Sequence, residues 1–154
     1  AAMTASTLKS RIQDDMKTAM KGGDKARLGI IRLILSATKQ VEVDERVELD
    51  DARIISILDK MVKQRRESAS QYETAGRQDL LDQETFEIGV LQTYLPAALS
   101  ENELEQLIAE AIASSGARTM QDMGKVMALL KPKVQGRTDM SAVSGKIKAK
   151  LGAA

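Results

Sequence analysis

Apolar residues recur every three or four positions along most of the 154-residue chain. That period places them on one face of an α-helix, so the pattern predicts a series of amphipathic helices. Stretches with such a face begin near residues 8, 25, 51, 79, 101, 120 and 142. Between these stretches stand residues that commonly start or stop helices, namely Gly22-Gly23, Asp24, Asp50, Gly76, Pro96, Ser100 and Gly116.

The last three helices are set apart from the first four by Pro96, which cannot continue a helix. Ser100 and Glu103 have the spacing of a capping box, which predicts a helix start directly after the break. Thr119 and Ser141 are the predicted N-caps of the two helices that follow. The sequence therefore predicts a larger N-terminal helical subdomain over residues 3–96 and a small three-helix subdomain over residues 97–152.

Two places depart from the helical pattern. Residues 41–49 alternate apolar and charged side chains, which is a strand period, but no second strand pattern lies nearby to pair with them. We therefore expect an acidic extended loop there.

Gly124 falls inside the predicted sixth helix, where it costs about 1 kcal/mol relative to alanine. Either a neighbouring helix packs closely against it or a ligand approaches its backbone.

The composition limits the kinds of fold, catalytic site and metal site that the chain can form. Apolar residues make up 43% of the chain and aromatic residues only 2%, which favours packed helices and an all-α fold. Cysteine and histidine are both absent, so a thiol nucleophile, a catalytic triad and a zinc site of the usual ligands are excluded. We expect no catalytic residue, no metal and no cofactor, although carboxylates or a lysine remain available for catalysis.

The charge is unevenly distributed. The net charge is only +1, but from residue 118 onward eight cations face two acids, a local balance of +6. Such a segment attracts an anionic partner, and without aromatic residues it lacks a platform for stacking unpaired bases. A structured, duplex-like nucleic acid that is recognised by its shape and backbone is therefore expected. No apolar run approaches the ~20 residues that span a bilayer, and the start lacks a secretory signal layout, so we expect a soluble cytoplasmic protein without a membrane partner.

Several short motifs follow one another in a recognisable order from about residue 8 to residue 151. They are Arg27-Leu28, Lys63-Gln64-Arg65, Tyr72-x-x-Ala75-Gly76-Arg77-x-Asp79-Leu80, Tyr94-Leu95-Pro96, Gly124-Lys125-Val126-Met127, Pro132-Lys133-Val134-x-Gly136-Arg137-x-Asp139 and Lys148-x-Lys150-Leu151. In this order they resemble the GatB/YqeY family and its free-standing members.

The resemblance implies an all-helical fold related to the tail of the B subunit of a glutamine-dependent amidotransferase. That enzyme converts Glu-tRNA(Gln) or Asp-tRNA(Asn) to the amidated form, and its tail helps to hold tRNA while the chemistry takes place elsewhere. Ala128-Leu129-Leu130 stands where the tail often has a glycine, which alters the expected approach of backbone to RNA. Matching positions imply a set of tRNA-facing residues, namely Gly124, Lys125, Pro132, Lys133, Gly136 and Arg137.

With this resemblance, the leading hypothesis is a non-catalytic tRNA-binding accessory module, linked to tRNA-dependent amidation or to translation more broadly, and no DNA partner is expected. The alternative is a protein-interaction adaptor whose cations meet an acidic partner, such as an amidotransferase or synthetase subunit. A third hypothesis, an enzyme that uses carboxylates alone, requires a buried acid with a shifted pKa.

Overall fold

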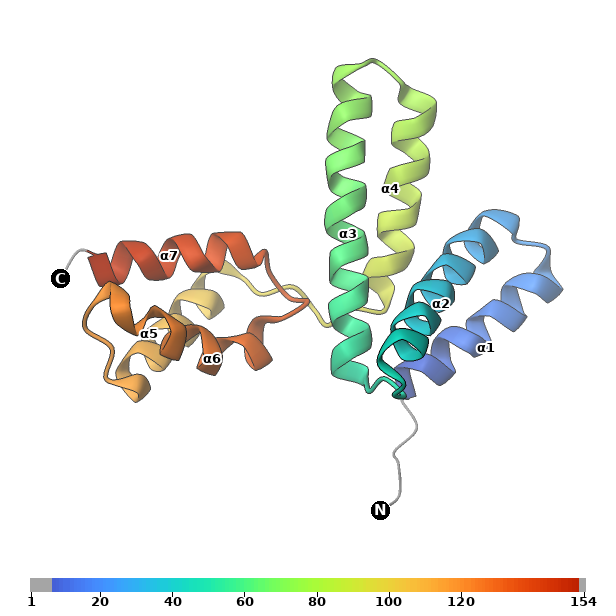
Figure 1. Cartoon of the computed structure of the whole chain (residues 1–154). Helices are drawn as coiled ribbons and strands as arrows, with labels where there is room; N and C mark the ends of the chain where they lie inside the picture. The colour runs from blue at the N-terminus through green and yellow to red at the C-terminus, as the bar shows by residue number, and fades with distance from the viewer. Residues whose placement is uncertain (1–6, 153–154) are drawn as a thin grey trace. The chain divides into compact units, whose positions relative to one another are not determined.

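The structure is a computed structural model that describes residues 7–152 (Figure 1). Every secondary-structure element in that range is a helix and none is a strand, which confirms the predicted all-α fold. The described residues form two compact units, one ending at Leu95 and the other beginning at Pro96. No helix among the described residues combines the length and the hydropathy needed to cross a membrane.

The N-terminal unit consists of two helical hairpins. Helices α1 (Thr7–Gly22) and α2 (Lys25–Glu45) form the first, and α3 (Asp51–Thr74) and α4 (Gln78–Thr93) form the second. Figure 1 shows α3 and α4 running antiparallel along most of their lengths. Residues from all four helices meet in one core, whose fully buried members include Ile12, Ile30, Ile31, Ile34, Ile54, Leu58 and Leu91.

Side-chain caps set the starts of α2 and α3, as the sequence predicted. The Asp24 carboxylate accepts a hydrogen bond of 3.1 Å from the Arg27 N–H, and Asp50 accepts one of 2.9 Å from the Arg53 N–H. Each bond satisfies a donor that the first turn of a helix leaves unpaired. Gly76 follows α3 with a φ of +70°, in the left-handed region that glycine adopts without strain.

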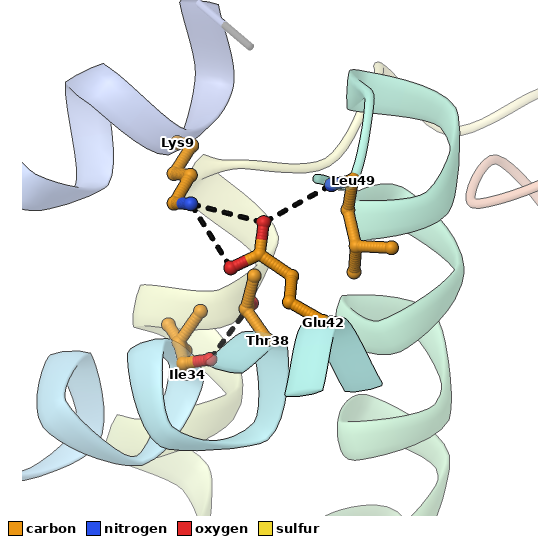
Figure 2. A network of polar contacts seen from close by, with 5 residues as sticks. All are labelled: Lys9, Ile34, Thr38, Glu42 and Leu49. Atoms are coloured by element: carbon orange, nitrogen blue, oxygen red, sulfur yellow. Dashed lines mark hydrogen bonds and ion pairs between the residues drawn. The ribbon is translucent and has the colours of Figure 1, made fainter. Parts of the chain in front are cut away.

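The extended loop predicted over residues 41–49 is wrong for residues 41–45, because α2 continues to Glu45, and only residues 46–49 lie in the connection to α3. The reason is a contact that lies far away in sequence. Glu42 is only 8% exposed, and both of its oxygens lie 3.0 Å from the Lys9 ammonium on α1 (Figure 2). One of these oxygens also accepts a 3.0 Å hydrogen bond from the Leu49 N–H. Glu42, which the sequence pattern placed in a loop, is thus a buried side chain that links the end of α2 to α1 and to Leu49.

The C-terminal unit is a three-helix arrangement. It contains α5 (Glu101–Ser115), α6 (Met123–Val134) and α7 (Met140–Gly152), with a single 3-10 turn, η1 (Met120–Asp122), leading directly into α6. Each long helix contributes one apolar stripe to a small core separate from that of the first unit. Its buried members are Leu104, Ile108, Ala111, Val126, Leu130, Val134, Val143, Ile147 and Leu151.

The capping box that begins α5 is confirmed: Ser100 accepts from the Glu103 N–H at 3.1 Å, and Glu103 accepts from the Ser100 N–H at 3.2 Å. Gly116 ends α5 with a φ of +69°, as predicted. The predicted cap of the last helix is wrong by two positions. Asp139 takes this role, because α7 begins at Met140 and the Asp139 carboxylate accepts from the Ser141 N–H at 2.9 Å.

Candidate nucleic-acid interface

Helix α6 turns one face to the core and the opposite face to solvent. Its fully buried residues recur every four positions from Val126 to Val134. On the opposite side Gly124, Ala128 and Pro132 also recur every four positions, and all three are exposed. Four residues are slightly more than one helical turn, so these small residues form a continuous line along the solvent side.

The surroundings of this line exclude close helix packing as the reason for Gly124. A side-chain carbon added at Gly124 would meet nothing within 4 Å. Gly124 is the second residue of α6, not an interior one as the sequence suggested, because the helix proper starts only at Met123. Pro132 has no N–H, so the carbonyl of Ala128 loses its helical donor and stays available to accept a hydrogen bond.

Two exposed lysines, Lys125 and Lys131, flank the line on its two sides, and a third, Lys133, lies about 100° further round the helix from Pro132. The Lys125 side chain is 70% exposed and lies 3.9 Å from the Asp122 carboxylate, a long and weak ion pair. Lys131 and Lys133 are exposed and have no ion-pair partner among residues 7–152. Both lie in the last turn of α6, where cations also interact favourably with the helix dipole. We define the α6 face by its exposed line and these three cations, namely Gly124, Lys125, Ala128, Lys131, Pro132 and Lys133.

Two residues of the predicted set, Gly136 and Arg137, lie in the turn after α6 and have roles within the fold. Gly136 has a φ of +76°, which the turn requires. The Arg137 guanidinium donates a 2.9 Å hydrogen bond to the Ala97 carbonyl, and the Arg137 carbonyl accepts one of 2.9 Å from the Leu99 N–H. Arg137 thus ties the segment before α5 to the turn before α7, and its contact with RNA stays a prediction.

Other cations of the basic segment are already paired. Lys146 and Lys150 on α7 lie 3.0 and 3.1 Å from the two oxygens of Glu105 on α5. Hydrogen bonds from Lys146 and then Lys150 lower the pKa of the Glu105 carboxyl below its ordinary value. The local balance of +6 therefore overstates the charge available to a partner. Lys131, absent from the predicted set, is available, and its place beside Pro132 on the exposed side is the signal that identifies it.

The motif residues of the N-terminal unit have internal partners. Arg65 on α3 lies 2.8 Å from Glu87 on α4, with both side chains mostly shielded from water. Arg77 lies 3.3 Å from Asp79 in the turn that joins these helices. The Arg65–Glu87 pair joins α3 to α4, whereas the exposed Arg77–Asp79 pair is local to the start of α4 and contributes little to stability.

Tyr94 is the third motif residue with an internal partner. It is buried, and its hydroxyl donates a 2.5 Å hydrogen bond to the Asp15 carboxylate on α1. Burial, and then this bond, raise the pKa of the Tyr94 hydroxyl far above its ordinary value. The Arg11 guanidinium lies 4.9 Å from the centre of the ring. The Tyr94 side chain therefore fastens the end of α4 to α1.

Glu84 on α4 is the acid with a raised pKa, and it bears on the carboxylate-enzyme hypothesis. Burial, and then the nearby Glu87 carboxylate, raise the Glu84 pKa above its ordinary value. One Glu84 oxygen is buried without a hydrogen-bond partner. The same side chain lies in the Arg65–Glu87 seam that joins α3 to α4, which favours a structural role. Among residues 7–152 no group of three or more metal-ligating side chains is close enough to hold a metal ion.

Comparison with protein families identifies the family of this chain. The family model described as Yqey-like protein matches residues 9–151, which includes both helical units and every motif discussed above. The chain belongs to the YqeY-like family. This confirms the family resemblance, whereas the match itself assigns no tRNA binding and no amidotransferase role.

Curated members of similar sequence are fungal proteins named "Altered inheritance of mitochondria protein 41, mitochondrial". The protein of Pyrenophora tritici-repentis is 30% identical over 149 residues, which cover 93% of this chain and 80% of that protein. Those of Eremothecium gossypii and Kluyveromyces lactis are 36% and 33% identical over 68% and 58% of this chain. The matches span 57% and 51% of these two relatives, so the chain covers little more than half of their length.

These names correct one expectation. The sequence predicted a cytoplasmic protein, and the relatives named as mitochondrial contradict that location. The prediction failed because its two criteria, a membrane-spanning run and a secretory signal, test for export and membrane insertion. Neither criterion distinguishes one aqueous compartment from another.

Proposed function

We propose that this YqeY-like protein is a non-catalytic tRNA-binding module and that the α6 face contacts the RNA. The observation that carries the proposal is that Lys131 and Lys133 are unpaired on α6 and that Lys131 lies beside an exposed line of small residues. Lysines bind phosphates as point charges and give affinity without base specificity. A surface of this kind suits a folded RNA whose backbone defines its shape.

The small residues of the α6 face support the same proposal. Open space above Gly124 allows a sugar–phosphate backbone to approach the helix closely. The Ala128 carbonyl, freed by Pro132, accepts a hydrogen bond, and the 2′-hydroxyl of RNA is a donor that DNA lacks. Charge, space and a free acceptor thus occur together on one side of α6.

The test is tRNA binding by a variant in which Lys125, Lys131 and Lys133 are all replaced by alanine. We expect its affinity at ~150 mM salt to fall at least about tenfold, because up to three phosphate contacts are lost. The matched control replaces Lys146 and Lys150, which belong to the same unit but are already paired with Glu105. Fluorescence anisotropy with labelled tRNA measures both. Equal affinity of the triple variant and the wild type would rule out the α6 face as the RNA site.

The adaptor hypothesis is tested in the same experiment. Leu129 is an exposed apolar residue beside Lys125 and Lys133 on α6, which is more useful to a protein partner than to a phosphate backbone. If wild-type protein gives no tRNA shift at ~150 mM salt and its pull-down partners survive RNase, the adaptor hypothesis is favoured. A steep loss of tRNA binding with added salt favours the RNA-binding proposal.

A further inference from the structure

The outer side of α2, in the N-terminal unit, carries cations at seven-residue spacing. Lys25, Arg32 and Lys39 lie within the helix and Arg46 is its C-cap, and we call these four residues the α2 stripe. All four are exposed. Seven residues make nearly two turns and rise about 10.5 Å, so the three cations within the helix lie in a row along its axis.

Three acids near the α2 stripe have partners outside it, whereas the exposed Glu48 lies at its C-terminal end, beside the same pocket as Arg46. Asp24 caps the start of α2 through its carboxylate. Asp44 accepts a hydrogen bond from Gln40, and Glu45 pairs with Arg53 at 2.6 Å. The cations of the α2 stripe have no ion-pair partner within the described part of the chain. Lys39 also acts electrostatically on the Glu42 carboxylate, which is paired with Lys9. The row is therefore a mostly positive surface on a unit whose overall charge is nearly balanced.

The residues beside and between the cations are small or aliphatic. Gly29, Ser36 and Val43 alternate with the stripe, and a side-chain carbon added at Gly29 would meet nothing within 4 Å. Leu33 is 48% exposed and Val43 is 58% exposed. Exposed aliphatic side chains offer nothing to a phosphate backbone, whereas they pack well against another helix. A seven-residue repeat is the spacing at which two packed helices keep their register.

A surface pocket of about 640 Å³ lies at the C-terminal end of the α2 stripe. Lys39, Val43 and Arg46 belong both to the outer side of α2 and to this pocket. Glu42, whose contacts with Lys9 and Leu49 are shown in Figure 2, also lines the pocket. Val47 adds a second aliphatic side chain. The pocket combines the apolar side chains of Val43 and Val47 with the cations Lys39 and Arg46 and the acid Glu48, so it can receive the side chain of a docked partner.

We propose that the outer side of α2 docks an acidic amphipathic helix of a partner protein. Carboxylates at seven-residue spacing on the partner pair with the α2 stripe, and its apolar side chains pack on Leu33, Val43 and the pocket. The small residues Gly29 and Ser36 allow the two helix backbones to approach. This inference goes beyond tRNA binding, because it concerns a different unit and a different class of partner.

The test uses a defined probe, a labelled helical peptide of about 25 residues, long enough to span the stripe, with glutamate every seventh position and leucines on the adjacent side. A second peptide of the same composition places the glutamates five residues apart. We expect the full chain to bind the first peptide at least about tenfold more tightly than the second, because only the first aligns its charges with the stripe.

Two double variants then locate the binding surface. Arg32→Glu with Lys39→Glu reverses the centre of the stripe, and Lys63→Glu with Arg66→Glu makes the same charge change on exposed positions of α3. We expect the stripe variant to lose at least about tenfold in peptide affinity and the α3 variant to bind like wild type. A peptide with lysine in place of glutamate should bind the stripe variant better than it binds wild type.

Gly29→Ala adds a variant that the helix itself tolerates, since alanine is the better helix former. We expect it to fold and to bind the peptide more weakly, because the added methyl group holds the two backbones apart. Equal binding of the two peptides, or equal loss in the stripe and α3 variants, would overturn the proposal. So would loss of tRNA affinity in the stripe variant with peptide affinity unchanged. Because the α6 variant tests RNA binding separately, either proposal can fail alone.

Discussion

Two regions of the molecule, the α3–α4 hairpin with its link to α1 and helix α6, use their polar side chains differently. In the N-terminal unit Arg65 pairs with Glu87 across the α3–α4 seam, and Tyr94 bonds to Asp15 on α1. In the C-terminal unit, Lys131 and Lys133 have no ion-pair partner among the described residues, and nothing within 4 Å faces Gly124.

This difference separates side chains that hold the fold from side chains that are left available. A charged side chain with an internal partner has already used its interaction, and removing it leaves the partner unpaired. A lysine without a partner contributes little to folding, because exposed charges of this kind are worth almost nothing to stability. Family motifs alone do not distinguish the two groups. Side-chain partners do.

The largest expected effect is on Arg65. Replacing Arg65 with methionine leaves the shielded Glu87 carboxylate unpaired, and we expect the free energy of unfolding to fall by about 2–4 kcal/mol. Urea denaturation followed by circular dichroism measures this change. Arg66→Met, at the exposed neighbouring position, is the control and should change stability by less than about 0.5 kcal/mol. Equal losses for the two variants would break the distinction between partnered and unpartnered cations.

The next effect concerns Tyr94. Tyr94→Phe keeps the buried ring but removes the hydrogen bond to Asp15, so we expect a loss of about 1–2 kcal/mol in the free energy of unfolding. Because the folded-state pKa of Tyr94 is raised, the stabilisation from the neutral hydroxyl is fully present below its ordinary pKa of 10.0 and is lost as pH rises above that value. Thermal unfolding at pH 7 and pH 11 checks both points. A Tyr94→Phe difference that persists undiminished at pH 11 would contradict this account.

Glu42 gives an effect of opposite pH dependence. Burial alone would raise the Glu42 pKa, but the Leu49 N–H and the Lys9 ammonium outweigh it and lower the pKa below the ordinary 4.5. The stabilisation from this carboxylate is therefore present above pH 4.5 and is lost as pH falls below it. We expect Glu42→Gln to lose about 1–2 kcal/mol at pH 7 and to approach wild type near pH 3. A constant difference across this range in denaturant titrations would argue against the Lys9–Glu42 contact.

The smallest effect on stability is expected for Lys131 and Lys133. Replacing both with alanine should change the free energy of unfolding by less than about 0.5 kcal/mol, because neither has an ion-pair partner in the described part of the chain. A loss above about 1 kcal/mol in urea titrations would show that these lysines serve the end of α6, as the helix dipole allows. The comparison between the two regions would then lose its basis.

The sequence predicted those parts of the fold that depend on local interactions. Asp24, Asp50 and the Ser100–Glu103 capping box act within one helical turn, so their spacing alone identifies them. Residues 41–45 were misjudged because Glu42 is buried by Lys9, thirty-three positions away. No local pattern carries that contact.

The candidate site shows the same limit. Lys125, Pro132 and Lys133 could be located from the motifs, and the structure shows that all three are exposed on α6. The internal bond from Arg137 to the Ala97 carbonyl, forty positions away, could not be predicted from spacing. Nor could the pairing of Lys146 and Lys150 with Glu105, which removes two cations from the apparent basic patch.

The most direct test of the central claim is the salt dependence of tRNA binding. Log affinity is plotted against log salt for wild type, for Lys131→Ala with Lys133→Ala, and for Lys146→Ala with Lys150→Ala. Each phosphate contact contributes about 0.7–0.9 to the slope, so we predict that the α6 variant flattens it by about 1.5 and that the α7 variant leaves it unchanged. Equal slopes for wild type and the α6 variant, or a larger change in the α7 variant, would contradict the claim that unpaired lysines of α6 hold RNA.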